Sequence, residues 1–327
     1  MLRTATLAIG AALLIILIWR LGPQEILAAL RQIGPYAAVV IPLYAAHHAT
    51  RALALRTCVL PPTTLRYIEA VAVRLSGEAV QVLTVTGPLL AEPTRAWLLQ
   101  RRGLTLTQGF AATISEYLVS LFVNAAMAIA ALASLIWYFR PAAGVSGIAV
   151  AVVCASSAFL IVSAIAITRR FYLIGAVIAG LARIGLLRGR CRPDLKAVNR
   201  MEDVLLALLH DRPRRLVATV AIEAAAQVFL VLELLAFLHA LDLAVPVSHA
   251  FMIEGSIKFI GLAFAFVPLQ VGVAEGAYAL IFDAVGLPPA AGFTLAFARR
   301  ARTIAVASVG LPTLVRLMRD RRPVDKS

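Results

Sequence analysis

Residues 91–110 read AEPTRAWLLQRRGLTLTQGF, and residues 274–293 read AEGAYALIFDAVGLPPAAGF. The second stretch repeats the first 183 residues later, with 7 identities over 20 positions and no gap. Each copy has a glutamate near its start and follows a proline that interrupts an apolar segment, Pro88 or Pro268. Duplicated, proline-broken segments of this kind are typical of transporters built from two repeats. The alternative is chance similarity between two stretches rich in alanine and leucine.

The composition of the chain is that of a membrane protein. Of its 327 residues, 61% are hydrophobic and only 15% are charged, whereas soluble domains have about 25% charged residues. The apolar runs are about 20 residues long and do not alternate, so the spanning elements are helices rather than strands of a barrel. We therefore expect an all-α, polytopic membrane helical bundle in which residues 1–327 form a single integral membrane domain.

Eight apolar segments are visible along the chain. Six of them read as full spans, at residues 5–21, 35–57, 109–139, 145–168, 214–241 and 290–315. Residues 5–21 resemble a signal peptide in part, but no small-residue cleavage site follows, so we expect a retained first span. The segments 67–101 and 249–286 are broken by Gly and Pro. Each is either two spans or a re-entrant hairpin of two short helices, and their charged residues favour the hairpin.

The distribution of basic residues predicts the orientation. The segment 169–215 has 11 Arg and Lys residues against four acids, and its net charge of +7 is half of the net charge of +14 of the whole chain. Residues 316–327 have five bases against two acids. Basic segments stay on the cytoplasmic side of a bacterial inner membrane, so we place both termini there. The two motif copies then have opposite orientations. This predicts an inverted repeat, with repeat 1 at about 35–139 and repeat 2 at about 214–315.

The basic segment 169–213 is expected to lie on the cytoplasmic membrane surface. Met201, Leu205 and Leu208 recur at helical spacing, and basic residues occupy the other faces. This pattern is typical of interfacial helices on anionic lipid. A surface that recruits lipid headgroups is the alternative, although orientation alone explains the charge.

Glu92 and Glu275 are the first candidates for a substrate-binding site, because they recur at matched positions. A short helix that begins after Pro88 or near Gly272 presents free backbone N–H groups to an anion. A glutamate beside it would take up a proton or bind a cationic headgroup. The structural alternative is that each glutamate caps or braces its own hairpin.

Three bases complete the predicted binding site. Arg95 lies three residues after Glu92, near the same helix face, and has a guanidinium suited to phosphate. Arg74 and Lys258 lie four residues from Glu78 and Glu254, so each is either a lipid-phosphate ligand or one half of a neutral intrahelical pair.

Four further charged residues lie in predicted spans or hairpins. They are candidates for proton coupling or for a brace between the repeats, and they are Glu116, Glu254, Arg299 and Arg300. The matched positions of Glu116 and Arg299, again 183 residues apart, suggest a pair from Glu116 to Arg299 or Arg300.

The sequence shows no motif for cofactor or metal chemistry. There is no nucleotide-binding loop, no spaced set of metal ligands and no nucleophile motif, and the three cysteines have no paired spacing. His47 and His48 lack a further ligand at helical spacing. We expect no cofactor, no metal, no nucleic-acid partner and no enzymatic activity.

Two motifs resemble a known family. The run of Pro88, Glu92, Arg95 and the apolar helix Ala96-Trp97-Leu98-Leu99 resembles the first signature of the flippase-like family named for the transmembrane region of lysylphosphatidylglycerol synthases. The stretch from Pro268 to Glu275 is similar to its second signature. The resemblance covers about residues 5–315. It implies lipid translocation or export without ATP, and it extends to hopanoid-associated members of similar length.

These observations lead to one main hypothesis and two alternatives. We expect a lipid transporter of the bacterial inner membrane whose headgroup site lies between two broken-helix hairpins, with membrane lipids, either phospholipid or polycyclic and polyprenyl lipid, as its partners. The alternatives are a membrane enzyme or enzyme subunit of polyprenyl or polycyclic lipid metabolism, and a scaffold for a biosynthetic partner. The sequence leaves open the lipid, the direction and the oligomeric state.

Overall fold

A computed structural model describes most of the chain. The described residues are 24, 31, 34–61, 63–84, 87–141, 143–169, 172, 175–176, 180, 195–263 and 272–319. They form ten α-helices and one short 3-10 helix, and no strand occurs among them. The predicted all-α fold is therefore confirmed. The predicted first span, 5–21, and the segment 264–271, which includes Pro268, lie outside the described residues.

The helices fall into two groups of four with a pair between them. The first group is α3 (Ala37–Cys58), α4 (Tyr67–Leu83), α5 (Pro88–Gln100) and α6 (Leu106–Phe139), preceded by η1 (Gly34–Tyr36). The middle pair is α7 (Ala143–Thr168) and α9 (Leu195–Leu209). The second group is α10 (Pro213–Ala240), α11 (Val247–Ala263), α12 (Val273–Ala284) and α13 (Pro289–Arg319).

Both predicted breaks fall between two helices. Gly87 has φ 48° directly before Pro88, the first residue of α5. A proline has no N–H to lose at a first helical position, and only glycine adopts such a φ at little cost. In the second group, Gly272 has φ 81° before α12, and its N–H donates to the Glu275 carboxylate at 2.9 Å.

The turns that follow the short helices α5 and α12 also have a glycine with positive φ at the same position. Gly103 precedes α6 with φ 100°, and Gly286 precedes α13 with φ 75°. The two glycines are the same 183 residues apart as the motif copies. Their shared positive φ explains why glycine recurs at this position of the motif.

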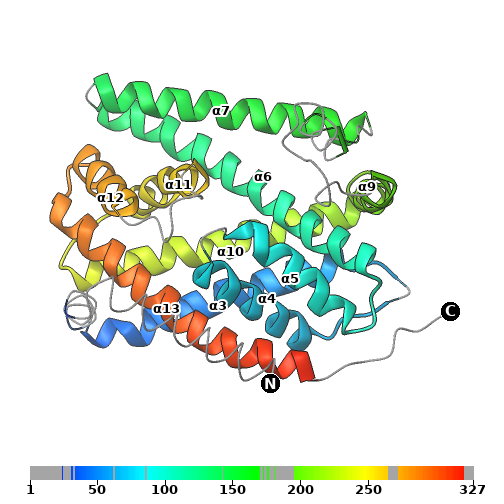
Figure 1. The fold of residues 1–327 in the computed structure, drawn as a ribbon. Coiled ribbons are helices and arrows are strands. Elements are labelled where there is room, and N and C mark those ends of the chain that lie inside the picture. Colours follow the sequence, from blue (N-terminus) through cyan, green and yellow to red (C-terminus); the bar gives the residue numbers. More distant parts are fainter. Residues whose placement is uncertain are drawn as a thin grey trace.

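The two groups of helices also pack in a matched way. Helix α3 packs against α10, α4 packs against α13, and α11 packs against α6. Figure 1 shows that α3 and α10 run in opposite directions, as do α6 and α13, with the α4–α5 and α11–α12 pairs toward opposite ends of the bundle. One apolar core surrounds α11 and α12, and a second surrounds α4 and α5.

Glycines allow close approach at two of the crossings between the groups. A Cβ atom on Gly310 of α13 would lie 2.2 Å from the carbonyl oxygen of Leu75 in α4. A Cβ on Gly255 of α11 would lie 2.3 Å from Cβ of Ala131 in α6. Small residues at helix crossings are a common device of membrane bundles, because they bring the backbones together.

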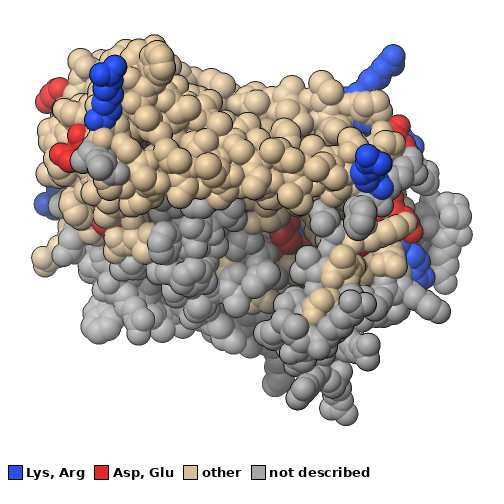
Figure 2. Space-filling view, turned by 90° about the horizontal axis from the view of Figure 1, so that it is seen from above, with Lys and Arg blue, Asp and Glu red and all other residues tan. Residues whose placement is uncertain are grey.

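Four helices are long and apolar enough to cross a membrane. They are Leu106–Phe139, Ser146–Thr168, Pro213–Ala240 and Pro289–Arg319. Only 17% of the apolar window of α7 is buried, against 44% for the other three, so α7 lies at the periphery. Helix α7 itself contains no charged residue, and in Figure 2 most of the charged side chains on this face lie toward its two ends, as expected of a surface in contact with lipid. Helix α3 has lower hydropathy and contains His47, His48 and Arg51.

The predicted helix around Met201 and Leu205 is α9. Leu205 and Leu206 are buried against Val119 of α6, and α9 packs on both α6 and α10. Its apolar face is therefore covered by protein. Most of the preceding basic segment lies outside the described residues, and its contact with lipid stays a prediction.

The crossing of α13 with α4 generates a test of the packing. Because a Cβ at position 310 meets the backbone of Leu75, Gly310→Ala should destabilise the protein by about 1–3 kcal/mol. The measurement is thermal unfolding of purified protein in detergent micelles. Gly276→Ala in α12 is the control, because a Cβ there meets nothing within 4 Å. Equal unfolding temperatures for the two variants would contradict this packing.

Candidate functional site

A polar cavity of about 440 Å³ lies among the helices of both groups. Its wall is made by α3, α4, α5, α6, α10, α11 and α13, and α7 covers one side. Five cationic side chains line it: Arg51, Arg74, Arg95, Lys258 and Arg302. Among the described residues, Glu78 is the one carboxylate in the lining. The remainder of the wall includes aromatic and apolar residues such as Tyr117, Leu121 and Phe159.

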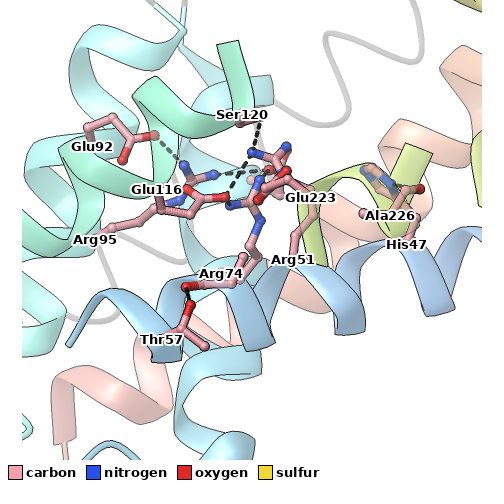
Figure 3. A network of polar contacts seen from close by, with 12 residues as sticks. His47, Arg51, Thr57, Arg74, Glu92, Arg95, Glu116, Ser120, Glu223 and Ala226 are labelled. Atoms are coloured by element: carbon pink, nitrogen blue, oxygen red, sulfur yellow. Dashed lines mark hydrogen bonds and ion pairs between the residues drawn. The ribbon is translucent and has the colours of Figure 1, made fainter. Parts of the chain in front are cut away.

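The bases on the α4–α5 side belong to a first ion-pair network (Figure 3). The carboxylate of Glu116 on α6 pairs with Arg74 of α4 at 2.5 Å and with Arg51 of α3 at 2.9 Å. Arg51 also pairs with Glu223 of α10 at 3.2 Å. Glu116 and Glu223 are fully buried and do not line the cavity. These acids therefore lie behind the bases that face the cavity.

The same network includes both charged residues of the first motif. Arg95 pairs with Glu92 in its own helix and with Glu78 of α4 at 2.9 Å. Arg74 pairs with Glu78 at 3.3 Å, which is the predicted i,i+4 pair. The side chain of Arg95 passes across Gly77, where a Cβ would lie 2.1 Å from its Nε atom. A glycine at position 77 thus leaves room for Arg95 to reach the cavity.

A second network lies on the side of α11 and α13. Arg299 pairs with Glu254 of α11 at 2.6 Å and with Glu233 of α10 at 3.3 Å. Glu254 also pairs with Lys258 at 2.6 Å, the second predicted i,i+4 pair. Arg302 pairs with Glu233 and stacks over the ring of Tyr44, 3.6 Å from the ring centroid. Here too the acids lie behind, and Lys258 and Arg302 line the cavity.

The two networks are built on matched positions with opposite charges. In the first, the acid Glu116 lies between the bases Arg51 and Arg74. In the second, the base Arg299 lies between the acids Glu233 and Glu254. The offsets from the first set to the second are 183 for Glu116, 182 for Arg51 and 180 for Arg74. The same triangle of α3, α4 and α6 thus recurs in α10, α11 and α13 with every sign reversed.

The ion pairs of the described residues do not include the predicted pair from Glu116 to Arg299 or Arg300, although Arg51 and Glu223 join the two groups. Glu116 pairs with Arg51 and Arg74, Arg299 pairs with Glu233 and Glu254, and Arg300 pairs with Glu275. The physical reason is that matched positions occupy equivalent places in the two groups. Each therefore pairs with residues of its own group instead of with the other matched residue.

The candidate binding residues fall into two sets. Arg74, Arg95 and Lys258 line one cavity, and Glu92 pairs with Arg95 behind its wall. Glu275 is separate from this set, because it pairs with Arg300 and accepts the N–H of Gly272. In place of Arg95, the second copy has Tyr278, whose hydroxyl oxygen accepts from Arg299 at 2.5 Å. The arrangement suits an anion, because five cationic side chains would surround it in the cavity.

Sequence reasoning did not assign Tyr44, Arg51 or Arg302 to the site. All three line the cavity. The available signal was a basic residue inside an apolar helix, since such residues normally face protein or a polar cavity. Their pairing across α3, α10 and α13 is not visible in sequence spacing. Among the described residues, no cluster of three or more His, Cys, Asp and Glu side chains is arranged to hold a metal.

Comparison with known proteins agrees with this architecture. A family model described as "Lysylphosphatidylglycerol synthase TM region" matches residues 4–310. The chain belongs to this family. The match confirms the resemblance inferred from the two motifs, and it spans both groups of helices and the cavity between them. No curated protein and no solved structure matches the chain. It is thus a membrane protein of the lysylphosphatidylglycerol synthase transmembrane-region family.

The second network generates a test of charge pairing. Glu254→Gln removes the one described partner of Lys258, so it should cost about 3–5 kcal/mol of the free energy of unfolding. Removing both charges in Glu254→Gln/Lys258→Met leaves no lone ammonium. The double variant should therefore be more stable than the single variant. The measurement is an SDS unfolding titration in micelles.

Asp283→Asn serves as the control for this comparison. Asp283 is exposed near the end of α12, so its substitution should change stability by no more than about 0.5 kcal/mol. A double variant less stable than Glu254→Gln would show that Lys258 does not depend on the Glu254 carboxylate.

Proposed function

We propose that this protein translocates or exports lipid across the bacterial inner membrane without ATP, with the lipid headgroup passing through the polar cavity. The observation that carries the proposal is the arrangement of charge around that cavity. Five cations line it, while the buried carboxylates that pair with them, Glu78 excepted, lie behind the wall. An anion that enters therefore meets guanidinium and ammonium donors before it meets carboxylates.

The membrane setting supports an amphipathic substrate. Charged side chains at membrane depth are costly and are retained mainly where they serve a site or a pathway. Phe159 and Leu121 place apolar surface beside the bases. A headgroup phosphate would bind Arg74, Arg95 and Lys258, because guanidinium and ammonium donors form charge-assisted hydrogen bonds to phosphate oxygens. The lipid tails would stay in the bilayer, next to the apolar face of α7.

We further propose that the two helix groups form an inverted repeat with both termini in the cytoplasm. The opposite directions of α3 and α10 and the matched contacts of α4 with α13 and α11 with α6 support this proposal. In such a fold, one group rocks against the other around a fixed central site. The cavity lies where the two groups meet, so this motion would expose it to either side in turn.

Within this mechanism the two motif glutamates have different roles. Glu92 would orient Arg95 toward the headgroup, because the two side chains are paired. Glu275 would hold the start of α12 through Gly272 and Arg300. We also propose that the protein is not an enzyme. The charged groups of the described cavity pair with one another and are not arranged as a nucleophile beside its base. Polycyclic lipid stays a candidate substrate beside phospholipid.

The test is lipid translocation in reconstituted vesicles. Lys258→Gln and Arg302→Gln each remove a cavity base but leave the acid behind it paired with Arg299. Both variants should fold and should move fluorescently labelled phosphatidylglycerol at least about tenfold more slowly, since a charge-assisted hydrogen bond is lost. The measurement is the rate at which dithionite quenches the label, with a labelled polycyclic lipid in parallel.

The matched control is Arg316→Gln, which removes an exposed base from the last turn of α13, away from the cavity lining. It should translocate at the wild-type rate. Wild-type rates in folded Lys258→Gln and Arg302→Gln proteins would remove the cavity from the pathway. No translocation of any lipid by wild-type protein would contradict the proposed function.

A further inference from the structure

His48 is a titratable group of the cavity that the proposed function does not yet use. It lies on α3, lines the cavity and is only 5% exposed. Among the described residues, neither of its ring nitrogens has a hydrogen-bond partner. The neighbouring His47 differs, because its Nδ1–H donates to the carbonyl oxygen of Ala226 at 2.8 Å. A buried imidazole without partners at the wall of a polar cavity points to a ligand that supplies them.

The surroundings of His48 restrict what that ligand is. The ring lies edge-on to Tyr44, with 4.6 Å between the centroids, and edge-on to His47 at 5.2 Å. Arg51 on the same helix, Arg74 and Glu78 on α4, and Arg302 on α13 are the charged groups that face it. Arg95 and Lys258 line the same cavity from α5 and α11. Cations outnumber acids around the imidazole, so an anion is the ligand that this wall favours.

The ion pairs around the cavity balance when all their groups are ionised. The first network has four acids and three bases, and the second has two acids and three bases. Six carboxylates therefore meet six cations, and their sum is zero. A monovalent anion that enters adds one uncompensated negative charge to an environment in which charge is poorly screened. One added proton restores the balance.

We propose that an anionic phosphate ester enters the cavity together with one proton, which His48 carries while the anion is bound. This inference rests on the proposed function and names its substrate class and its coupling ion. The proton comes from water, and a ring nitrogen lone pair of His48 accepts it. The imidazolium N–H then donates to a phosphate oxygen as a charge-assisted hydrogen bond.

The step is balanced and reversible. No covalent bond to the phosphate forms or breaks, and no electron is transferred. When the anion leaves, the imidazolium returns its proton to water on the side where the cavity is then open. Anion and proton cross as a neutral pair, so a pH difference across the membrane would set the direction of net lipid movement. A phosphodiester headgroup of a lipid and a free phosphodiester share this chemistry.

The test is calorimetric binding to full-length protein in a neutral detergent at pH 7.5, in buffers of different ionisation enthalpy. The probe is dihexanoylphosphatidylglycerol, whose phosphate charge is constant at this pH. Wild-type protein should take up about one proton for each lipid bound, as linkage requires when a group gains a proton on binding. His48→Gln should take up none and should bind about tenfold more weakly. The zwitterionic dihexanoylphosphatidylcholine should cause no proton uptake.

Two further variants make the assignment specific. His239→Gln, at an exposed position at the end of α10, is the matched control and should keep the wild-type proton uptake. Glu223 is the competing proton site, because its carboxylate is fully buried and shares Arg51 with the carboxylate of Glu116. Proton uptake that survives in His48→Gln, or is lost only in Glu223→Gln, would overturn the inference. Nitrogen NMR of labelled histidine tests the same claim without a variant, since one imidazole should become protonated when the anionic lipid is added.

The outcomes also separate this inference from the proposed function. Lipid binding and translocation without proton uptake would leave the transporter proposal in place and remove His48 as the carrier. Dimethyl phosphate, which has the same charge and no chains, distinguishes the two sources of the anion. If it bound as tightly as the lipid and with the same proton uptake, the inference would stand and the lipid function would be contradicted. Absence of binding for either anion would overturn both proposals.

Discussion

Buried charge is the constraint on which the architecture depends. An isolated charged side chain at membrane depth costs roughly 2.5–3.5 kcal/mol or more, so each must find an opposite charge or a polar cavity. This protein meets the constraint with two triangles of charge, Glu116 between two arginines and Arg299 between two glutamates. Each triangle joins three helices, so forming its ion pairs also determines how those helices pack. The signs are reversed between the triangles, and in each one a central charge pairs with two opposite charges on two other helices.

The same triangles explain why the cavity is cationic. Carboxylates such as Glu116 and Glu254 are buried between helices, and the longer Arg and Lys side chains extend from them toward the open space. The pairs thus hold the bases in place and leave their donor groups lining the cavity. Glycines make room for this arrangement, because they have no side chain to obstruct a neighbouring residue or helix. Gly77 leaves room for Arg95, and Gly255 and Gly310 bring α11 and α13 close to their partner helices.

Much of the fold was predictable from patterns within single segments. Hydropathy predicts the approximate bounds of α6, α7, α10 and α13. Helix-breaking residues predict the breaks before Pro88 and near Gly272. Helical spacing predicts the pairs of Arg74 with Glu78 and of Glu254 with Lys258. The partners of Glu116 and Arg299 did not follow, because pairs between helices depend on packing and not on distance along the chain. For the same reason the sequence did not assign Arg51 and Arg302 to the cavity, which they line. It also placed Glu275 in the binding site, whereas Glu275 pairs with Arg300 away from the cavity lining.

The central claim is that the cavity between the two helix groups is a headgroup site for anionic lipid. An experimental structure of the protein in nanodiscs of phosphatidylglycerol tests it most directly. The account predicts phosphate density inside the cavity, within hydrogen-bonding distance of Lys258 or Arg302 and of His48, with the acyl chains leading toward the bilayer. Lipid density confined to the outer surface of α7 and the other helices, with the cavity bases still paired only to their carboxylates, would contradict it.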